Sequence, residues 1–126
     1  MFIRIDSSPY KLLQAWLGGR FELVSSNAQI EEIARVARYP QVRRYIPPPE
    51  VGWLVNLIRE RGRVIDRLPR VDASNDPSDN FLLATAEAGE ADYLVTGDKA
   101  GMLAIGKHGK TNIVSVDEMV TTLKLR

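Results

Sequence analysis

Short apolar runs alternate with longer amphipathic segments along most of the chain. Helical spacing of the apolar positions predicts helices over residues 9–17, 27–39, 49–61 and 78–88, a last helix from Asp117, and short helical pieces at 41–46 and 102–105. The runs expected to form strands are residues 2–5, 21–24, 64–68, 93–96 and 113–116. These runs are continuously apolar, which is typical of a parallel sheet covered on both faces. The pattern therefore predicts a doubly wound α/β fold in a single domain over residues 1–126.

Capping residues mark several of the expected helix ends. Ser26 and Gln29 have the spacing of a capping box, and Ser78 and Asp117 stand where helices are expected to begin. Gly89 follows the helix over 78–88 and is expected to end it in a left-handed conformation. The single histidine, His108, lies among glycines and lysines and is expected on the surface of a loop.

Charge is unevenly distributed along the chain. The 126 residues carry a net charge of +1, but residues 1–70 hold 12 basic and 7 acidic residues while residues 71–126 hold 5 basic and 9 acidic ones. The absence of cysteine excludes disulfides and thiolate metal sites. No apolar stretch approaches the roughly 20 residues that span a bilayer, and residues 1–6 do not resemble a secretory signal, so we expect a cytoplasmic protein.

Two acidic residues follow expected strands closely enough to lie at one edge of the sheet. Asp98 comes directly after the run 93–96 and Gly97, and Asp79 lies in the first turn of the next helix after the run 64–68. Helix dipoles and turn chemistry also favour aspartates at such positions. A cluster of carboxylates in a chain without cysteine offers a metal oxygen ligands and no thiolates, and such ligands suit Mg²⁺ or Mn²⁺. Position gives no reason to choose Glu32, because Arg35 is expected to pair with its neighbour Glu31.

The motifs around these acids resemble those of the PIN-domain ribonucleases. The resemblance is carried by residues 76–86, DPSDNFLLATA, and residues 91–98, ADYLVTGD. Within the family, these motifs are most similar to those of the toxin components of toxin–antitoxin systems. Residues 21–26, FELVSS, and 32–36, EIARV, resemble that family's second strand and the helix that bears its second acid. The likeness extends over about residues 10–123.

The resemblance implies a three-layer α/β/α fold with a parallel sheet of four to five strands. It also implies a metal-dependent endoribonuclease that hydrolyses RNA phosphodiester bonds, is neutralised by a cognate antitoxin and can form a homodimer. By motif match, catalytic and metal-binding roles fall on Glu32, Asp79 and Asp98, with Thr96 and Asn80 as supporting polar groups. The basic N-terminal half would contact the RNA backbone, with Arg38, Arg43 and Arg44 as the expected contacts.

The start of the chain departs from the family pattern, which opens with a strand ending in Asp-x-Asn or Asp-x-Ser. One interpretation takes residues 2–5 as that strand and Asp6 as the first metal ligand, followed by Ser7 and Ser8. The other takes residues 6–9 as a loop between helices, with the strand and its aspartate missing, and the spacing from Asp6 to Trp16 favours it. A module that binds RNA or an antitoxin without cleavage is therefore the alternative to an active enzyme. The RNA target, the cleavage site and the antitoxin are not predicted.

Overall fold

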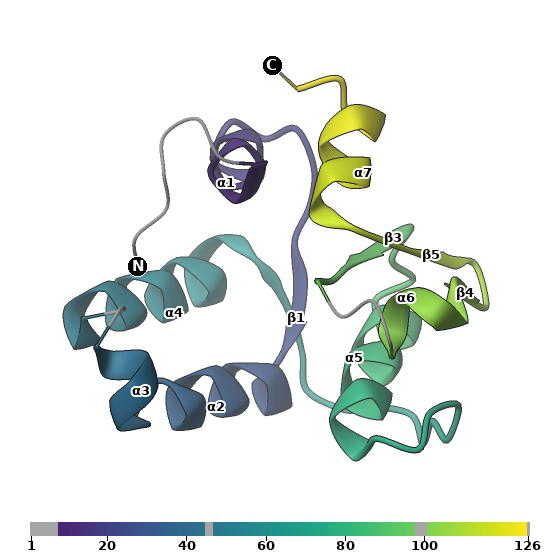
Figure 1. Cartoon of the computed structure of the whole chain (residues 1–126), viewed down its shortest axis with the longest axis horizontal. Helices are drawn as coiled ribbons and strands as arrows, with labels where there is room; N and C mark the ends of the chain where they lie inside the picture. Colours follow the sequence, from purple (N-terminus) through teal and green to yellow (C-terminus); the bar gives the residue numbers. More distant parts are fainter. Residues whose placement is uncertain (1–7, 45–46, 98–100, 126) are drawn as a thin grey trace.

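The computed structural model describes residues 8–44, 47–97 and 101–125, and Figure 1 shows their arrangement. The helices in this part of the chain are α1 (Ser8–Leu17), α2 (Asn27–Val36), α3 (Pro40–Arg43), α4 (Pro48–Arg61), α5 (Pro77–Ala88), α6 (Met102–Ile105) and α7 (Val116–Thr122). The strands are β1 (Val24–Ser26), β2 (Arg63–Ile65), β3 (Tyr93–Val95), β4 (Lys107–His108) and β5 (Thr111–Val114). None of the described helices has the length and apolar character needed to cross a membrane.

The strands form two small sheets instead of one. In the first, β1 and β2 run parallel, with Ser25 opposite Val64. In the second, β5 lies between β3 and β4, parallel to β3 and antiparallel to β4. The chain is mixed α/β as expected, but a single parallel sheet of four to five strands is wrong for the described residues. The expected first strand, residues 2–5, lies outside them.

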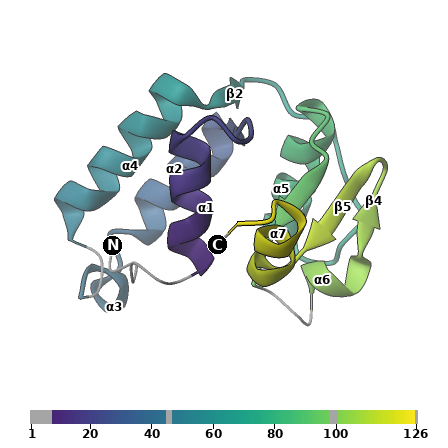
Figure 2. The ribbon, with the colours of Figure 1, turned by 90° about the horizontal axis from the view of Figure 1, so that it is seen from above.

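Each sheet has its own apolar core. Trp16 of α1, Ile30 of α2 and Ile58 of α4 are buried together beside the first sheet, and Leu83 of α5, Met102 of α6 and Ile113 of β5 are buried together beside the second. Seen from above, α1, α2 and α4 form one group and α5, α6 and α7 another (Figure 2). Burial of apolar surface therefore stabilises each group of elements separately. Contacts between the two groups hold them together.

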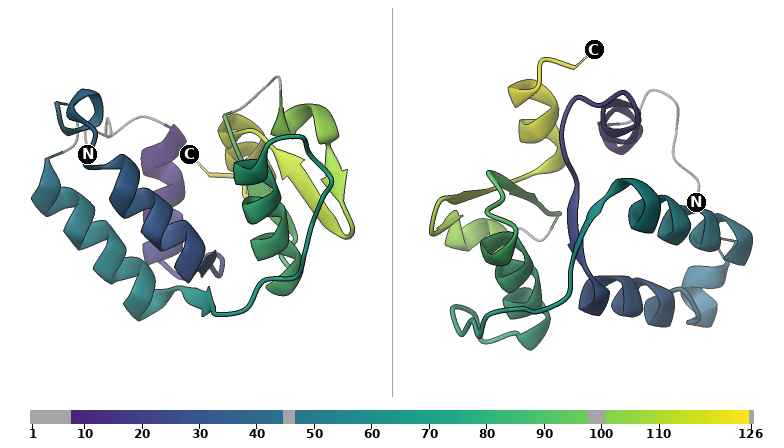
Figure 3. Two further views of the ribbon diagram at one scale, coloured as in Figure 1. Left: turned by 90° about the horizontal axis from the view of Figure 1, so that it is seen from below. Right: turned by 180° about the vertical axis from the view of Figure 1, so that it is seen from behind.

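Helix α5 supplies much of the connection, because it packs against both β1 and β3. The hydroxyls of Ser26 and Thr85 are buried and 2.9 Å apart; Thr85 donates to the carbonyl of Phe81, so Ser26 donates to Thr85. At the end of the helix, Gly89 faces Val24 so closely that an added Cβ would lie 2.3 Å from the valine Cγ1. Strands β1 and β2 and the loop that leads from β2 to α5 can be followed in the two views of Figure 3.

The end of α5 corrects the expected role of Gly89. The amide of Glu90 donates to the carbonyl of Glu87, and that of Ala91 donates to the carbonyl of Ala86, which together form a Schellman motif. Its left-handed residue is Glu90, with φ of 51°, and not Gly89. Glycine at position 89 is required for the close approach of α5 to β1.

Several boundaries also differ from expectation. Helix α2 ends at Val36 because Pro40 starts α3 and holds Tyr39 in an extended conformation. Helix α5 begins at Pro77, one residue before the expected cap. Ser115, and not Asp117, caps α7 in a complete capping box with Glu118. At the start of α2, Ser26 accepts from the Gln29 amide as expected, whereas the Gln29 side chain accepts from Ser25.

The segment around His108 is a hairpin strand and not a surface loop. His108 belongs to β4, and its side chain is only 18% exposed, with Nε2 3.5 Å from a carboxylate oxygen of Glu87. Gly109 adopts a left-handed φ of 58° in the turn to β5. Glycine is as typical of a tight hairpin turn as it is of a loop, so the composition around His108 does not distinguish the two.

We expect Gly89→Ala to destabilise the protein by about 1–3 kcal/mol, because the new methyl group would force α5 away from Val24. The matched control is Gly52→Ala in the middle of α4, where no atom lies within 4 Å of an added Cβ. This control should raise stability by about 0.5–1 kcal/mol, since alanine is the better helix former. Chemical denaturation of both variants checks the prediction, and equal effects would contradict it.

Candidate acidic site at the start of helix α5

Asp79 is the one buried carboxylate among the described residues. It lies in the first turn of α5, is 8% exposed, and accepts a hydrogen bond from the Ser74 hydroxyl at 3.3 Å. The Ser74 hydroxyl in turn accepts from the amide of Asp76 at 3.1 Å. The first turn of a helix favours a negative charge through the unpaired amides and the helix dipole. Asp79 is therefore held and oriented at the end of the loop that follows β2.

Asn80 holds that loop in place. Its Oδ1 accepts from the amides of Ala73 at 3.2 Å and Ser74 at 2.9 Å, while its Nδ2 donates to the carbonyl of Ser74 at 2.9 Å. Three hydrogen bonds from one half-buried side chain fix the backbone on either side of Ser74. Asn80 thus positions Ser74, and Ser74 positions the carboxylate of Asp79.

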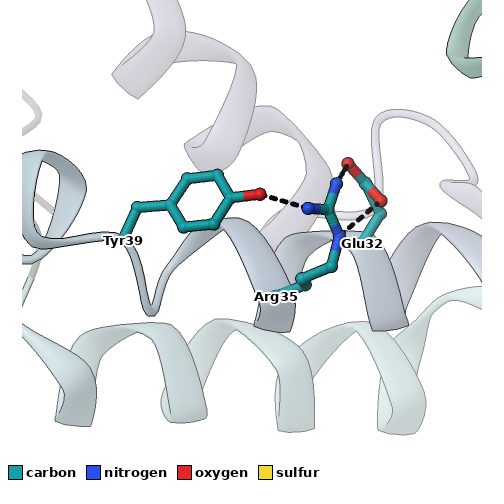
Figure 4. A network of polar contacts seen from close by, with 3 residues as sticks. All are labelled: Glu32, Arg35 and Tyr39. Atoms are coloured by element: carbon teal, nitrogen blue, oxygen red, sulfur yellow. Dashed lines mark hydrogen bonds and ion pairs between the residues drawn. The ribbon is translucent and has the colours of Figure 1, made fainter.

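Glu32 is engaged elsewhere, on α2. Its carboxylate accepts two hydrogen bonds from Arg35, which also donates to the Tyr39 hydroxyl and lies 5.6 Å from the centre of its ring (Figure 4). The hydrogen bond to Glu32 raises the pKa of the Arg35 guanidinium above its ordinary value. The expected pairing of Arg35 with Glu31 is wrong: Arg35 binds Glu32, three residues before it, and donates to Tyr39, which lies beyond the end of α2.

The described residues do not gather a metal centre by themselves. In residues 8–44, 47–97 and 101–125, no three histidine, aspartate or glutamate side chains come close enough to hold an ion together. Asp6 and Asp98, two of the expected ligands, lie outside these ranges. Thr96 directly follows β3, and its amide donates to the carbonyl of Val114 at 3.0 Å. Of the two expected acids that the structure describes, Asp79 and Glu32, only Asp79 has the buried, hydrogen-bonded setting of a metal ligand, and it cannot hold a cation alone.

A second polar pair at the carboxyl ends of the strands was not singled out from the sequence. Asn27 directly follows β1 and Asp66 directly follows β2, and the asparagine Nδ2 donates to Asp66 Oδ1 at 2.6 Å. The apolar run over residues 64–68 predicts a strand that includes Asp66, so the sequence does not point to Asp66 as a site residue. In the structure β2 ends at Ile65, and Asp66 therefore lies directly after the strand, where a site residue is expected.

The three arginines expected to bind RNA are exposed together at one end of the molecule. Arg38 follows α2, Arg43 ends α3 and Arg44 comes directly after it. Figure 1 shows α3 joining α2 to α4 at the end of the molecule away from α5 and β5. The positive charge is therefore separated in space from Asp79 as well as in sequence.

Helices alternate with short, mostly parallel strands, and a buried aspartate lies in the first turn of the helix that follows β2, so the protein is of the α/β class with a candidate acidic site. The chain matches the PIN domain family over residues 2–100 and belongs to it. Proteins of this family generally depend on a divalent metal ion, and the family suggests an RNA substrate. No curated protein and no solved structure matches the chain.

We expect Asn80→Ala to destabilise the protein by about 1–3 kcal/mol, because the amides and the carbonyl that it holds would lose their partner. Asn112→Ala, at an exposed position of β5, is the matched control and should change stability by less than about 0.5 kcal/mol. Thermal unfolding measures both. If Asn112→Ala were as destabilised as Asn80→Ala, the prediction that the three hydrogen bonds of Asn80 stabilise the loop would be contradicted.

Proposed function

We propose that this protein is a metal-dependent endoribonuclease, the toxin of a toxin–antitoxin pair that acts in the cytoplasm. Membership of the PIN domain family supports a nuclease. The observation that carries the proposal for this chain is the buried Asp79, held by Ser74 in a loop fixed by Asn80. Burying a carboxylate costs free energy unless it is paired or coordinates a metal, and a neutral hydroxyl such as that of Ser74 offsets only part of that cost.

The proposed metal is Mg²⁺ or Mn²⁺, held by Asp79 together with Asp98 and Glu32, and by Asp6 if residues 2–5 form the first strand. When bound, such an ion lowers the pKa of a bound water and neutralises charge that develops on the phosphate. Ser74 would orient the carboxylate of Asp79, as hydrogen-bond donors around metal ligands commonly do. Thr96 would stand beside the same edge as a supporting polar group.

Glu32 needs a change of partner to take part. Its carboxylate is occupied by Arg35, and both side chains are about half exposed. An exposed ion pair contributes little to stability, so a divalent cation could displace Arg35 at small cost. The released guanidinium would then add to the positive charge available to RNA.

The same ion pair favours a second candidate function, a PIN-like module that binds RNA or an antitoxin without cleavage. With Glu32 neutralised by Arg35, the described acids offer a metal only Asp79 from the expected set. The arginine-bearing end of the molecule would still attract RNA in such a protein. Metal binding and RNA binding therefore need separate measurements.

We expect Asp79→Asn to abolish Mn²⁺ binding and Mn²⁺-dependent cleavage of single-stranded RNA. Ser74→Ala should weaken metal binding by about 10–100-fold, since it removes the donor that orients the carboxylate. Asp72→Asn, an exposed acid in the same loop, is the matched control for the loss of one charge. Calorimetric titration with Mn²⁺ and a cleavage assay on each purified variant give the two readouts.

The outcomes separate the two candidate functions. Loss of both readouts in Asp79→Asn but not in Asp72→Asn supports the nuclease. Binding of RNA by the unaltered protein, with no metal binding and no cleavage, supports the non-cleaving module. Cleavage that persists unchanged in Asp79→Asn would refute the role of this residue.

We expect Arg43→Ala/Arg44→Ala to weaken RNA binding and reduce its dependence on salt. Each lost phosphate contact lowers the slope of log K against log salt by about 0.7 for single strands, so the double variant should lose about 1.4. Arg67→Ala/Arg70→Ala removes the same charge from another exposed segment and is the matched control. Fluorescence anisotropy over a salt series measures the slopes, and equal losses in both variants would indicate only a net-charge effect.

A further inference from the structure

Tyr39 is an exposed aromatic residue whose backbone the surrounding structure holds in one position. It lies between α2 and α3, and it is 38% exposed. Pro40 restricts it to an extended conformation, and its carbonyl accepts from the amides of Val42 and Arg43, each at 2.9 Å. Its own amide donates to the carbonyl of Val36 at 3.1 Å. Both backbone polar groups of Tyr39 therefore have partners, and the direction in which its side chain leaves the backbone is fixed.

The hydroxyl end of the tyrosine ring is also held. Arg35 donates a hydrogen bond to the Tyr39 hydroxyl, and its guanidinium carbon lies 5.6 Å from the centre of the ring. In Figure 4 the hydroxyl points toward Arg35, which lies between Tyr39 and Glu32. A side chain that is already fixed loses little conformational entropy when a ligand binds to it. The ring of Tyr39 is therefore a preorganised and partly exposed aromatic surface.

The sequence on both sides of this tyrosine is strongly basic. Residues 33–44, IARVARYPQVRR, include four arginines and neither aspartate nor glutamate, and we call this segment the α2–α3 corner. Arg38 directly precedes Tyr39, and Arg43 and Arg44 follow it on α3 and directly after α3; all three are exposed. Arg43 lies one helical turn from Tyr39, because its amide donates to the tyrosine carbonyl. The α2–α3 corner therefore combines an aromatic ring with several cations.

A second exposed tyrosine, Tyr93 of β3, shows what distinguishes the α2–α3 corner. Tyr93 is 37% exposed, almost the same as Tyr39. Its neighbours along the chain are acidic, since Asp92 directly precedes it and Glu90 comes three residues before it. The two tyrosines therefore have the same exposure in surroundings of opposite charge, and only Tyr39 lies beside groups that attract a polyanion.

The chemistry of the α2–α3 corner fits a single-stranded nucleic acid. In such a ligand the bases are free to stack on an aromatic ring while the phosphates contact arginines. In a duplex the faces of the bases are covered by neighbouring base pairs, so an exposed ring cannot stack on them. An acidic peptide would also be attracted by the arginines, but it would leave the preorganised ring of Tyr39 without a role.

We propose that the α2–α3 corner binds single-stranded RNA, with one base stacked on Tyr39 and the neighbouring phosphates in contact with Arg43 and Arg44. The identity of the ligand as RNA rests on the proposed function. The new element is Tyr39, which makes the site selective for unpaired bases. Because α3 lies at the end of the molecule away from α5 (Figure 1), the corner holds a part of the strand other than the part that reaches Asp79.

The test measures the affinity of the protein for a short oligoadenylate RNA, with EDTA present so that no metal-dependent cleavage occurs. Tyr39→Ala should weaken binding by about 5–150-fold, the effect of losing one stacked base. Tyr39→Phe keeps the ring and should bind nearly as tightly as the unaltered protein. Tyr93→Ala removes the equally exposed tyrosine beside acidic residues, so this matched control should leave the affinity unchanged. Fluorescence anisotropy gives the affinities, and circular dichroism checks that each variant is folded.

Two further readouts separate stacking from charge and from a structural role. Tyr39→Ala removes no charge, so the slope of log K against log salt should equal that of the unaltered protein while the affinity falls at every salt concentration. An abasic RNA of the same length keeps the phosphates and lacks the bases. Tyr39→Ala and the unaltered protein should therefore bind the abasic RNA equally well, whereas a structural role of Tyr39 would weaken the binding of both RNAs.

A loss of affinity in Tyr39→Ala that is confined to the RNA with bases supports the stacking site. Unchanged affinity in Tyr39→Ala would overturn the stacking site, and so would an equal loss in Tyr39→Phe or an equal loss with the abasic RNA. An unaltered protein that binds neither RNA would also overturn it and would favour an acidic protein partner for the arginines. Because the measurements are made without metal, the stacking site can be refuted while the proposed nuclease function stands, and the reverse.

Discussion

The hydrogen bond between the Ser26 and Thr85 hydroxyls connects the two halves of the molecule at a buried point. Ser26 ends β1, caps α2 through the Gln29 amide, and donates to Thr85 on α5, so one side chain fixes three elements. Leu82, three residues before Thr85 on α5, lines a groove together with residues of α2 and α4. Without this bond the buried Ser26 hydroxyl would keep the Gln29 amide as a donor but would have no acceptor for its own proton, so the contact is maintained by a penalty as much as by an attraction.

The position of Asp79 follows from that arrangement. Because α5 is held against β1 at Thr85 and Gly89, its first turn lies at a fixed distance along the helix from both contacts. The loop that leads from β2 to α5 is then fixed by Asn80, and Ser74 orients the carboxylate. Glu32 lacks such support, since its carboxylate is held by an exposed arginine on its own helix. The two acids differ in how firmly the fold holds them.

The helices could be predicted from the sequence because their signals are local. Apolar spacing found α1, α4 and α5 to within a residue or so, and a proline accounts for the early end of α2. The assembly of the strands could not be predicted in the same way, since pairing depends on segments far apart in the chain and β1, β2 and β3 have only three residues each. Glu90 and Ser115 show the same limit, because a cap is decided by which neighbour the helix end meets and not by the most suitable residue nearby.

The acids of the candidate site also couple its electrostatics to the fold. Asp66 directly follows β2, and Asp79 lies in the first turn of α5 at the end of the loop that leaves β2. Carboxylates that a fold brings together repel each other unless a cation offsets their charge. An ion that binds only the folded protein stabilises it by mass action. Under the proposed function, metal binding and the folding of the loop between β2 and α5 would therefore stabilise each other.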